Sequence, residues 1–315
     1  MLYALGLGAE IAGVTFECDF PPEARTKRIV VRSRLSGSKN AAEIDREVSE
    51  FVSRGESLYE VDKAGLEEIA PDLIITQELC HVCAATPGDL ASSLEHLRRP
   101  PQVLSLNAQT LAGVWMDIRN LGTATGRGKQ AEQLIRELEH RLVQVEQAIT
   151  DSAARPRVVC LEWLDPPFIA GHWVPEMAAL AGGIDALGEP GKPGFRTTWE
   201  NILSVEPEII LMMPCGYHLD SVFEELAKMP IPEGWSALPA VRAGRVYALD
   251  GSSYFSRPGP RLAAGIEILA SVFHPDHAPV KPRASSDGNR AAFRAPRRAE
   301  GIYCTASWRR SAFFK

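Results

Sequence analysis

The sequence predicts an α/β protein made of two lobes with parallel sheets, joined by one long linking helix. Short apolar runs typical of strands alternate with amphipathic helical patterns, and this alternation favours parallel sheets. The two halves of the chain repeat the plan. Between them, apolar residues keep helical spacing over 110–121 and 129–150, on either side of a polar break at 123–128. The second stretch contains no Gly or Pro and spans roughly 30 Å, enough to bridge two domains. A long surface helix on a single α/β domain is the alternative.

In the first half, strands are expected where apolar runs are bounded by turn residues, and helices where apolar residues recur at helical spacing. Ile44, Val48 and Phe51 define the inward face of one helix. Thr86 followed by Pro87 is a typical helix start, with Thr as N-cap and Pro at the first helical position. The expected strands are 11–16, 57–61, 73–76 and 103–106, and the expected helices are 40–54, 62–69 and 86–98.

The second half carries the same signals. A helix, a Pro-acid turn and a buried strand follow one another at Pro71-Asp72 and again at Pro207-Glu208, which favours two similar lobes. We therefore divide the chain into an N-terminal lobe at 1–108, the linking helix at 109–151 and a C-terminal lobe at 152–277. The expected strands of the second half are 157–161, 208–212 and 246–249, and the expected helices are 175–181, 199–205, 218–228 and 260–273.

Residues 278–315 differ from the rest in charge. They hold nine Lys or Arg and two acids, a net charge of +7. Because the whole chain has a net charge of −6, the 277 residues before them carry −13. Little apolar periodicity accompanies this charge, and we predict a basic, disordered tail.

Composition excludes several functional classes. The net charge of −6 and the pI near 5.7 argue against nucleic acid as the main partner. Six cysteines in 315 residues are too few for a disulfide scaffold, and no apolar run reaches the length of a membrane span. The apolar start at 1–8 lacks the basic residues of a signal peptide. It looks like the end of an amphipathic helix, so we expect the chain to begin part-way into a domain.

The candidate site lies in the loops that follow the strands, because ligands of open parallel sheets bind beyond the carboxyl ends of the strands. These loops hold four of the six cysteines, three of the seven histidines and many aromatics. Aromatic faces with a few polar groups suit a large flat ligand with a polar rim, although a core position is the alternative for each aromatic taken singly. The candidate ligand contacts are Glu78, Trp163, Phe168, Trp173, Tyr217, Tyr254 and Arg257.

The segment Cys80-His81-Val82-Cys83 is the sharpest local motif. A CxxC pair can be a redox pair, a disulfide or half of a metal site, and inert cysteines are a further alternative. Cys18 and Cys215 would complete a four-thiolate set across the cleft, with His81 or His172 able to replace one thiolate. A c-type heme needs His directly after the second Cys, where Ala84 stands. No nucleophile elbow, Walker loop, dinucleotide fingerprint or evident triad is present, so we expect a binding protein rather than an enzyme.

Several motifs together resemble the periplasmic binding proteins for cobalamin and ferric siderophores, the substrate-binding components of ABC importers. The resemblance covers roughly residues 1–277, and the chain is most similar to a branch labelled cobalamin-binding. It implies two Rossmann-like lobes joined by a rigid helix. It also implies a corrinoid or related metal chelate in the cleft, no required cofactor, an importer permease as partner and, we expect, a monomer. The motifs are 3–8, 11–14, the two Pro-acid turns, the helix after 125–126, 182–183, 17–21, 80–83, 171–176 and 213–216.

The chain departs from this family pattern in three ways. The family's first strand, its following turn and a signal peptide would all precede Met1. A periplasmic location is therefore implied by resemblance, while a cytoplasmic form stays open. Family members dock on the permease with one surface Glu per lobe, seven residues before the Pro of each Pro-acid turn. Glu200 fits this place in the second lobe, whereas the first-lobe place holds Ala64, with Glu67 nearby.

Two hypotheses follow. In the first, the chain binds a corrinoid, with the candidate aromatics on the ligand faces, Glu78 and Arg257 on its polar groups, and His81 or His172 on the metal. In the second, it is a cytoplasmic metal-binding or redox protein that uses Cys18, Cys80, Cys83 and Cys215.

Overall fold

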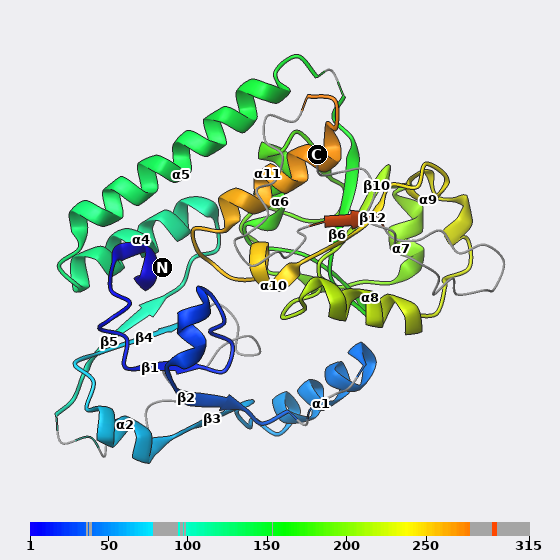
Figure 1. The fold of residues 1–315 in the computed structure, drawn as a ribbon. Helices are drawn as coiled ribbons and strands as arrows, with labels where there is room; N and C mark the ends of the chain where they lie inside the picture. Colours follow the sequence, from blue (N-terminus) through cyan, green and yellow to red (C-terminus); the bar gives the residue numbers. More distant parts are fainter. Residues whose placement is uncertain are drawn as a thin grey trace.

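In the computed structural model, two α/β regions lie beside a layer of long helices (Figure 1). The structure describes residues 1–35, 37, 40–77, 94, 97, 99–152, 154–277 and, for the backbone alone, 292–294. We call residues 1–108 the N-terminal lobe and 152–277 the C-terminal lobe. The predicted α/β fold class with parallel sheets is confirmed.

The linking segment is a helical hairpin. Helix α4 (Leu111–Ala124) and helix α5 (Gly128–Ile149) meet at a three-residue turn, at the polar break that the sequence predicts. Gly126 takes a left-handed φ of 68° there, a conformation that glycine adopts without steric cost. A Cβ at Gly122 would lie 2.6 Å from the Cβ of Ala131, so glycine at this position allows the two helices to approach.

The C-terminal lobe is built on one sheet with the strand order β12-β11-β10-β6-β7-β9, with β8 paired to β6. Its centre is parallel, as predicted, because β11, β10, β6 and β8 run the same way. The strands β7, β9 and β12 join antiparallel at the edges. The bounds are β6 (Arg157–Leu164), β7 (Pro167–Ile169), β8 (Ile184–Asp185), β9 (Phe195–Arg196), β10 (Ile209–Met212), β11 (Val246–Leu249) and β12 (Ala292–Arg294).

The N-terminal lobe carries two separate small sheets. In one, β1 pairs parallel with β2, and β2 pairs antiparallel with β3; in the other, β4 pairs parallel with β5. The sequence reading missed β2, although the apolar run Ile29, Val30 and Val31 was a signal for it. The bounds are β1 (Gly13–Thr15), β2 (Arg28–Ser33), β3 (Tyr59–Val61), β4 (Leu73–Gln77) and β5 (Gln102–Leu106).

Most predicted helices are present with ends close to those expected. Asn40 caps α1 through a capping box with Glu43, and Asp62 caps α2. The expected helix at 86–98 lies almost wholly outside the described residues. The helices are α1 (Ala41–Ser53), α2 (Lys63–Ile69), α6 (Val174–Leu180), α7 (Trp199–Ser204), α8 (Leu219–Lys228), α9 (Pro239–Arg242), α10 (Gly251–Tyr254) and α11 (Leu262–Phe273), with 3₁₀ helices η1 (Leu2–Leu5), η2 (Pro22–Thr26) and η3 (Trp235–Ala237).

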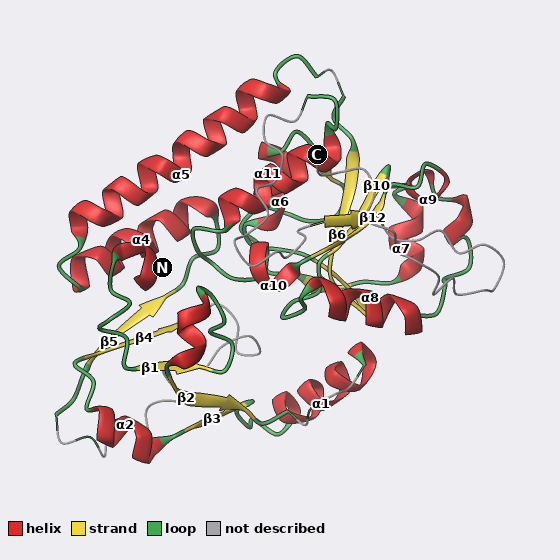
Figure 2. Cartoon of the chain, viewed as in Figure 1, coloured by secondary structure: helices red, strands yellow, loops and turns green. Residues whose placement is uncertain are grey.

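Apolar clusters lie on both faces of the C-terminal sheet, and Figure 2 shows helices on either side of it. On one face, α6 and α11 pack with the linking helices; on the other, α7 and α8 pack. Arg141 of α5 forms a two-bond ion pair with Glu267 of α11, at 2.7 and 2.8 Å. The linking hairpin is therefore part of the C-terminal lobe's helical layer. A small cluster of Val30, Val31 and Leu66 is the separate core of the β1-β2-β3 sheet.

Within 278–315 the structure describes only β12, which pairs antiparallel with β11. The predicted disorder of the remaining tail lies outside the described residues and stays a prediction. In the part of the chain that the structure describes, no helix is both long and apolar enough to cross a bilayer.

Candidate functional site

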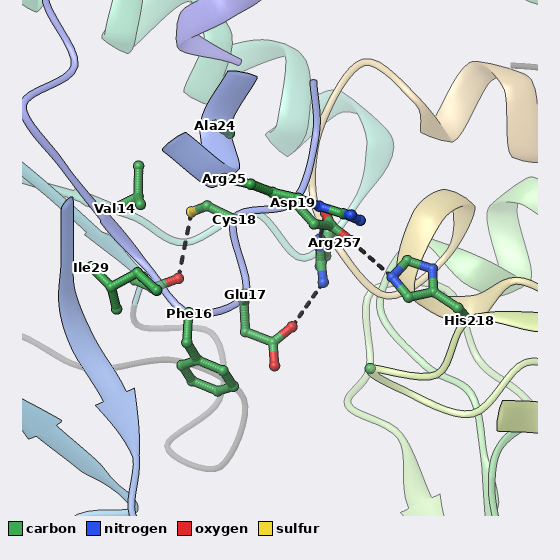
Figure 3. Close-up of a pocket in the computed structure, with 12 residues that line it drawn as sticks. Val14, Phe16, Glu17, Cys18, Asp19, Ala24, Arg25, Ile29, His218 and Arg257 are labelled. Carbon is green, nitrogen blue, oxygen red and sulfur yellow. Dashed lines mark hydrogen bonds and ion pairs between the residues drawn. The ribbon is translucent and has the colours of Figure 1, made fainter. Parts of the chain in front are cut away.

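A pocket of about 330 Å³ lies where the two lobes meet. The N-terminal lobe supplies β1, the loop after it and η2, and the C-terminal lobe supplies the loop after β10 and the segment after α10 (Figure 3). Both loops follow the carboxyl ends of strands, where ligands of parallel sheets bind. The lining residues are Val14, Thr15, Phe16, Glu17, Cys18, Asp19, Ala24, Arg25, Ile29, Gly216, His218 and Arg257.

A network of four charged side chains crosses this pocket, and we call it the inter-lobe latch: Glu17, Asp19, His218 and Arg257. Arg257 donates from one nitrogen to Asp19 at 2.6 Å and from the other to Glu17 at 2.8 Å. His218 Nε2 donates to the second oxygen of Asp19 at 2.8 Å. Figure 3 shows both acids pointing from the loop after β1 towards the C-terminal lobe. Asp19 thus binds two C-terminal side chains at once.

A buried carboxylate contacts the ring nitrogen of His218 that does not bind Asp19. Asp250 is 1% exposed, lies 3.1 Å from His218 Nδ1, and caps α10 by accepting from the backbone of Ser253. Hydrogen bonds to Asp19 and to Asp250 raise the pKa of His218 to about 9. The imidazole is therefore protonated at neutral pH, and both ring nitrogens donate.

The same contacts keep Asp19 ionised. Burial opposes its charge, but the hydrogen bond from His218 and the charge of Arg257 outweigh burial and lower the pKa of Asp19 well below its usual range. Burial likewise opposes the charge of Arg257, while Asp19 and Glu17 raise its pKa. Asp19, His218 and Arg257 are thus all charged at neutral pH.

Two of the predicted ligand aromatics lie together beside the pocket. Trp163, at the end of β6, and Tyr217, next to His218, stack edge to face with ring centroids 5.4 Å apart. The Trp163 indole donates to the backbone oxygen of Ala41 in the N-terminal lobe at 3.3 Å. Phe168 lies on β7 under the guanidinium of Arg196, 5.2 Å from its ring centre.

Two other predicted aromatics lie inside the C-terminal lobe. Trp173 is 2% exposed, and its indole donates to the backbone oxygen of Phe255 at 2.7 Å. Tyr254 is 8% exposed and belongs to the same core cluster. Both follow strands, as the prediction required, but both belong to the core cluster that also contains residues of α6 and α11. In this structure they present no face to the cleft.

The cysteine hypothesis rests partly on residues that the structure does not describe. Glu78, Cys80, His81 and Cys83 all lie outside the described residues. Cys18 lines the pocket and lies 3.5 Å from the hydroxyl of Thr15, while Cys215 is half-buried, and both are free thiols. Among the described residues, no three His, Cys, Asp or Glu side chains group as metal ligands would.

His172 does not line the pocket. It takes a left-handed φ of 55°, its buried Nδ1 has no hydrogen-bond partner, and burial lowers its pKa. Its backbone oxygen accepts from Gly191 at 2.9 Å, which fixes it against the loop before β9. The predicted permease-facing acids, Glu200 on α7 and Glu67 on α2, are both exposed.

Sequence reasoning missed three latch residues: Glu17, Asp19 and His218. All lie in loops that the prediction singled out, directly after apolar strands. A signal was present, because opposite charges in facing loops favour pairing across a cleft. The pairing partners themselves depend on the lobe arrangement, which the sequence did not supply.

Residues 1–252 match the periplasmic binding protein family. The chain belongs to this family. It is 27% identical over 282 residues to the uncharacterized ABC transporter substrate-binding lipoprotein YvrC of Bacillus subtilis, across 87% of this chain and 76% of YvrC. It is 28% identical over 153 residues to the high-affinity heme uptake system protein IsdE of Staphylococcus aureus, across 45% of this chain and 49% of IsdE.

Solved structures share the fold at low sequence identity. The periplasmic vitamin B12 binding protein BtuF of Vibrio cholerae superposes with a TM-score of 0.61 at 20% identity, across 86% of this chain and 91% of BtuF. A periplasmic heme binding protein from Pseudomonas aeruginosa gives a TM-score of 0.67 at 19% identity, across 89% of this chain and 90% of that protein. The two-lobed architecture is common to all three.

Family membership fixes the general role. The chain is a substrate-binding protein of an ABC transporter, whose partners are a small-molecule ligand and a permease. The family is one of transport proteins rather than enzymes and is normally extracytoplasmic. Its members bind their ligands as cargo and not as catalytic cofactors.

Proposed function

We propose that the chain binds a corrinoid, or a related tetrapyrrole or metal chelate, in the cleft between its lobes and delivers it to an importer permease. One observation carries this proposal: a charged pocket and an aromatic pair lie side by side where strand-end loops of both lobes meet. Aromatic faces bind flat macrocycles, and charged groups orient their polar side chains.

Each described residue has a distinct role in this proposal. Trp163 and Tyr217 pack against the ligand face. Arg257, with the exposed Arg25 at the pocket margin, binds acceptor groups on the ligand rim. Arg257 now donates to Glu17 and Asp19, so ligand acceptors would exchange with these carboxylates. Because 330 Å³ is at the lower end of ligand-pocket volumes, about 300–1,000 Å³, the lobes must separate to admit a macrocycle.

The solved relatives support this ligand class. BtuF binds vitamin B12, and the Pseudomonas aeruginosa protein binds heme. We further propose that the protein acts outside the cytoplasmic membrane as a monomer. Glu200 and Glu67, exposed on one helix of each lobe, would then contact the permease.

Titration of the purified protein with cobalamin, heme and a ferric siderophore tests the proposal. We expect one of the three to bind tightly with one-to-one stoichiometry, followed by absorption spectra and calorimetry. A Trp163→Ala variant should then bind that ligand at least about tenfold more weakly, a loss of about 1.4 kcal/mol.

Trp199→Ala provides the matched control. Trp199 stacks edge to face on Trp235, with ring centroids 5.7 Å apart, in the same lobe, and it does not line the pocket. Its loss should leave affinity unchanged. Folded protein that binds none of the three ligands, or equal affinities for both tryptophan variants, would refute the proposed ligand class or the proposed contact.

A further inference from the structure

Helix α1 belongs to the N-terminal lobe but reaches across to the other lobe. Figure 1 shows it extending from the β1-β2-β3 sheet to a position below α8. Its apolar side chains are covered unevenly: Phe51 is 8% exposed, Ile44 and Val48 are half-buried, and Val52 is 56% exposed. Packing within its own lobe therefore holds the end of α1 at Phe51, which lies under the guanidinium of Arg34, while the beginning of the helix depends on other contacts.

The first residue of α1 is held by two side chains of the C-terminal lobe. The amide of Ala41 donates to Glu225 of α8 at 3.2 Å, and its carbonyl accepts from the Trp163 indole at 3.3 Å. Ala41 is 1% exposed and Glu225 is 6% exposed. A carboxylate at a helix N-terminus also gains from the helix dipole. These contacts are thus shielded from water and complement each other.

One turn further on, an ion pair holds the same helix. Arg196 of β9 donates to both oxygens of Asp45, at 2.8 and 2.9 Å, while its guanidinium lies over Phe168. Through these contacts, α1 binds the indole N–H of Trp163 and the Arg196 guanidinium that lies over Phe168. A macrocycle packing on Trp163 would therefore compete with α1, whose Ala41 carbonyl accepts from the indole.

We infer that α1 is a displaceable strap: it holds the Trp163 side of the cleft shut through Ala41 and Asp45, and an incoming ligand competes with it. The strap itself rests on these contacts alone, whereas the competition also rests on the proposed ligand site. The two parts are therefore tested by separate measurements.

Hydrogen exchange in the ligand-free protein tests the strap. In a variant carrying Glu225→Gln and Arg196→Ala, the amides of α1 should exchange at least about fivefold faster than in the unaltered protein, because charge-assisted bonds to the helix are lost. The matched control is Glu68→Gln, which removes an exposed ion pair with Arg28 within the N-terminal lobe and should leave α1 exchange unchanged. Equal exchange in all three proteins would overturn the strap.

Binding tests the competition. Asp45→Asn weakens the strap without touching the pocket, so whichever of cobalamin, heme or ferric siderophore binds should do so about threefold more tightly. The same ligand, at saturation, should speed exchange of the α1 amides in the unaltered protein. Unchanged or weaker binding by the Asp45→Asn variant would refute the competition. Failure of all three ligands to bind would refute the proposed function, while the exchange experiment still decides the strap.

Discussion

The two lobes differ in how they are held together. In the C-terminal lobe one continuous sheet lies between helices, and every residue of its central strand, Ile209–Met212, is buried. In the N-terminal lobe two small sheets carry strands that are mostly half-buried. Hydrophobic burial is the dominant stabilising term in folding. The C-terminal lobe is therefore stabilised mainly by its own hydrophobic core, and the N-terminal lobe depends more on polar contacts with the C-terminal lobe.

The largest expected effect comes from making one substitution in both cores. Leu211 is fully buried in β10 within the large cluster, and Leu66 is 5% exposed in the three-residue cluster of α2 and β2. Leu→Ala in a core costs about 2–5 kcal/mol, and the cost rises when the cavity cannot collapse. We expect Leu211→Ala to fall near the top of this range and Leu66→Ala near the bottom.

Chemical denaturation followed by circular dichroism measures both losses of unfolding free energy. Because the substitution and the starting side chain are the same, the difference reports the surroundings alone. Equal losses would show that the small N-terminal cluster is as tightly packed as the C-terminal core, and the contrast between the lobes would fail.

The second-largest expected effect comes from a substitution in the inter-lobe latch, which joins the two lobes. Asp19→Asn keeps the size of the side chain but removes the charge that binds His218 and Arg257. Hydrogen bonds to charged groups contribute about 1.5–3 kcal/mol each when buried; since Asp19 is only partly buried, we expect a total loss of about 1–2 kcal/mol in unfolding free energy. Small-angle scattering should also show a more open molecule.

Glu68→Gln is the control for this latch variant. Glu68 pairs with Arg28 within the N-terminal lobe and is 67% exposed, and exposed ion pairs contribute little to stability. Neither stability nor molecular dimensions should change. A latch variant that behaves like this control would mean that the lobes keep their arrangement without Asp19.

The contrast between the lobes also explains what the sequence could predict. The central strands of the C-terminal lobe, such as 246–249, are continuous apolar runs, and the structure has β11 at those residues. The short edge strand β9 has no such pattern because its two residues are exposed. Phe168 and Trp173 both follow the predicted strand 157–161, yet Trp173 is buried and Phe168 is half-buried. Burial depends on how helices pack over the loops, and local patterns do not record that.

The latch shows the same limit. The loops after the strands indicated a site, but Asp19 and His218 are 199 residues apart, and only the lobe arrangement pairs them. The capping box at Asn40 joins residues three apart in the sequence, whereas the bonds from Trp163 and Glu225 to Ala41 join the two lobes. Local chemistry was therefore predictable, and contacts between lobes were not.

The smallest expected effect is a pH dependence that separates the latch from the cores. The folded pKa of His218 is raised from 6.5 to about 9, so its contribution is complete below pH 6.5 and is lost as pH rises through 9. The pKa of Asp19 is lowered from 3.8, so its contribution is complete above that value and is lost as pH falls. The latch should stabilise the molecule most between about pH 5 and 6.5.

As pH rises from 6.5 to 9, thermal melting should show a fall in the stability of the unaltered protein. The His218→Asn variant lacks the imidazole charge and should show no such fall. His218 has a side chain that is 39% exposed, so solvent screening limits its contribution to about 1 kcal/mol. The hydrophobic cores have no such pH dependence, and Leu66→Ala should therefore shift the whole profile downward without changing its slope. Parallel profiles for the unaltered protein and the His218→Asn variant would mean that the charge of His218 does not hold the lobes together.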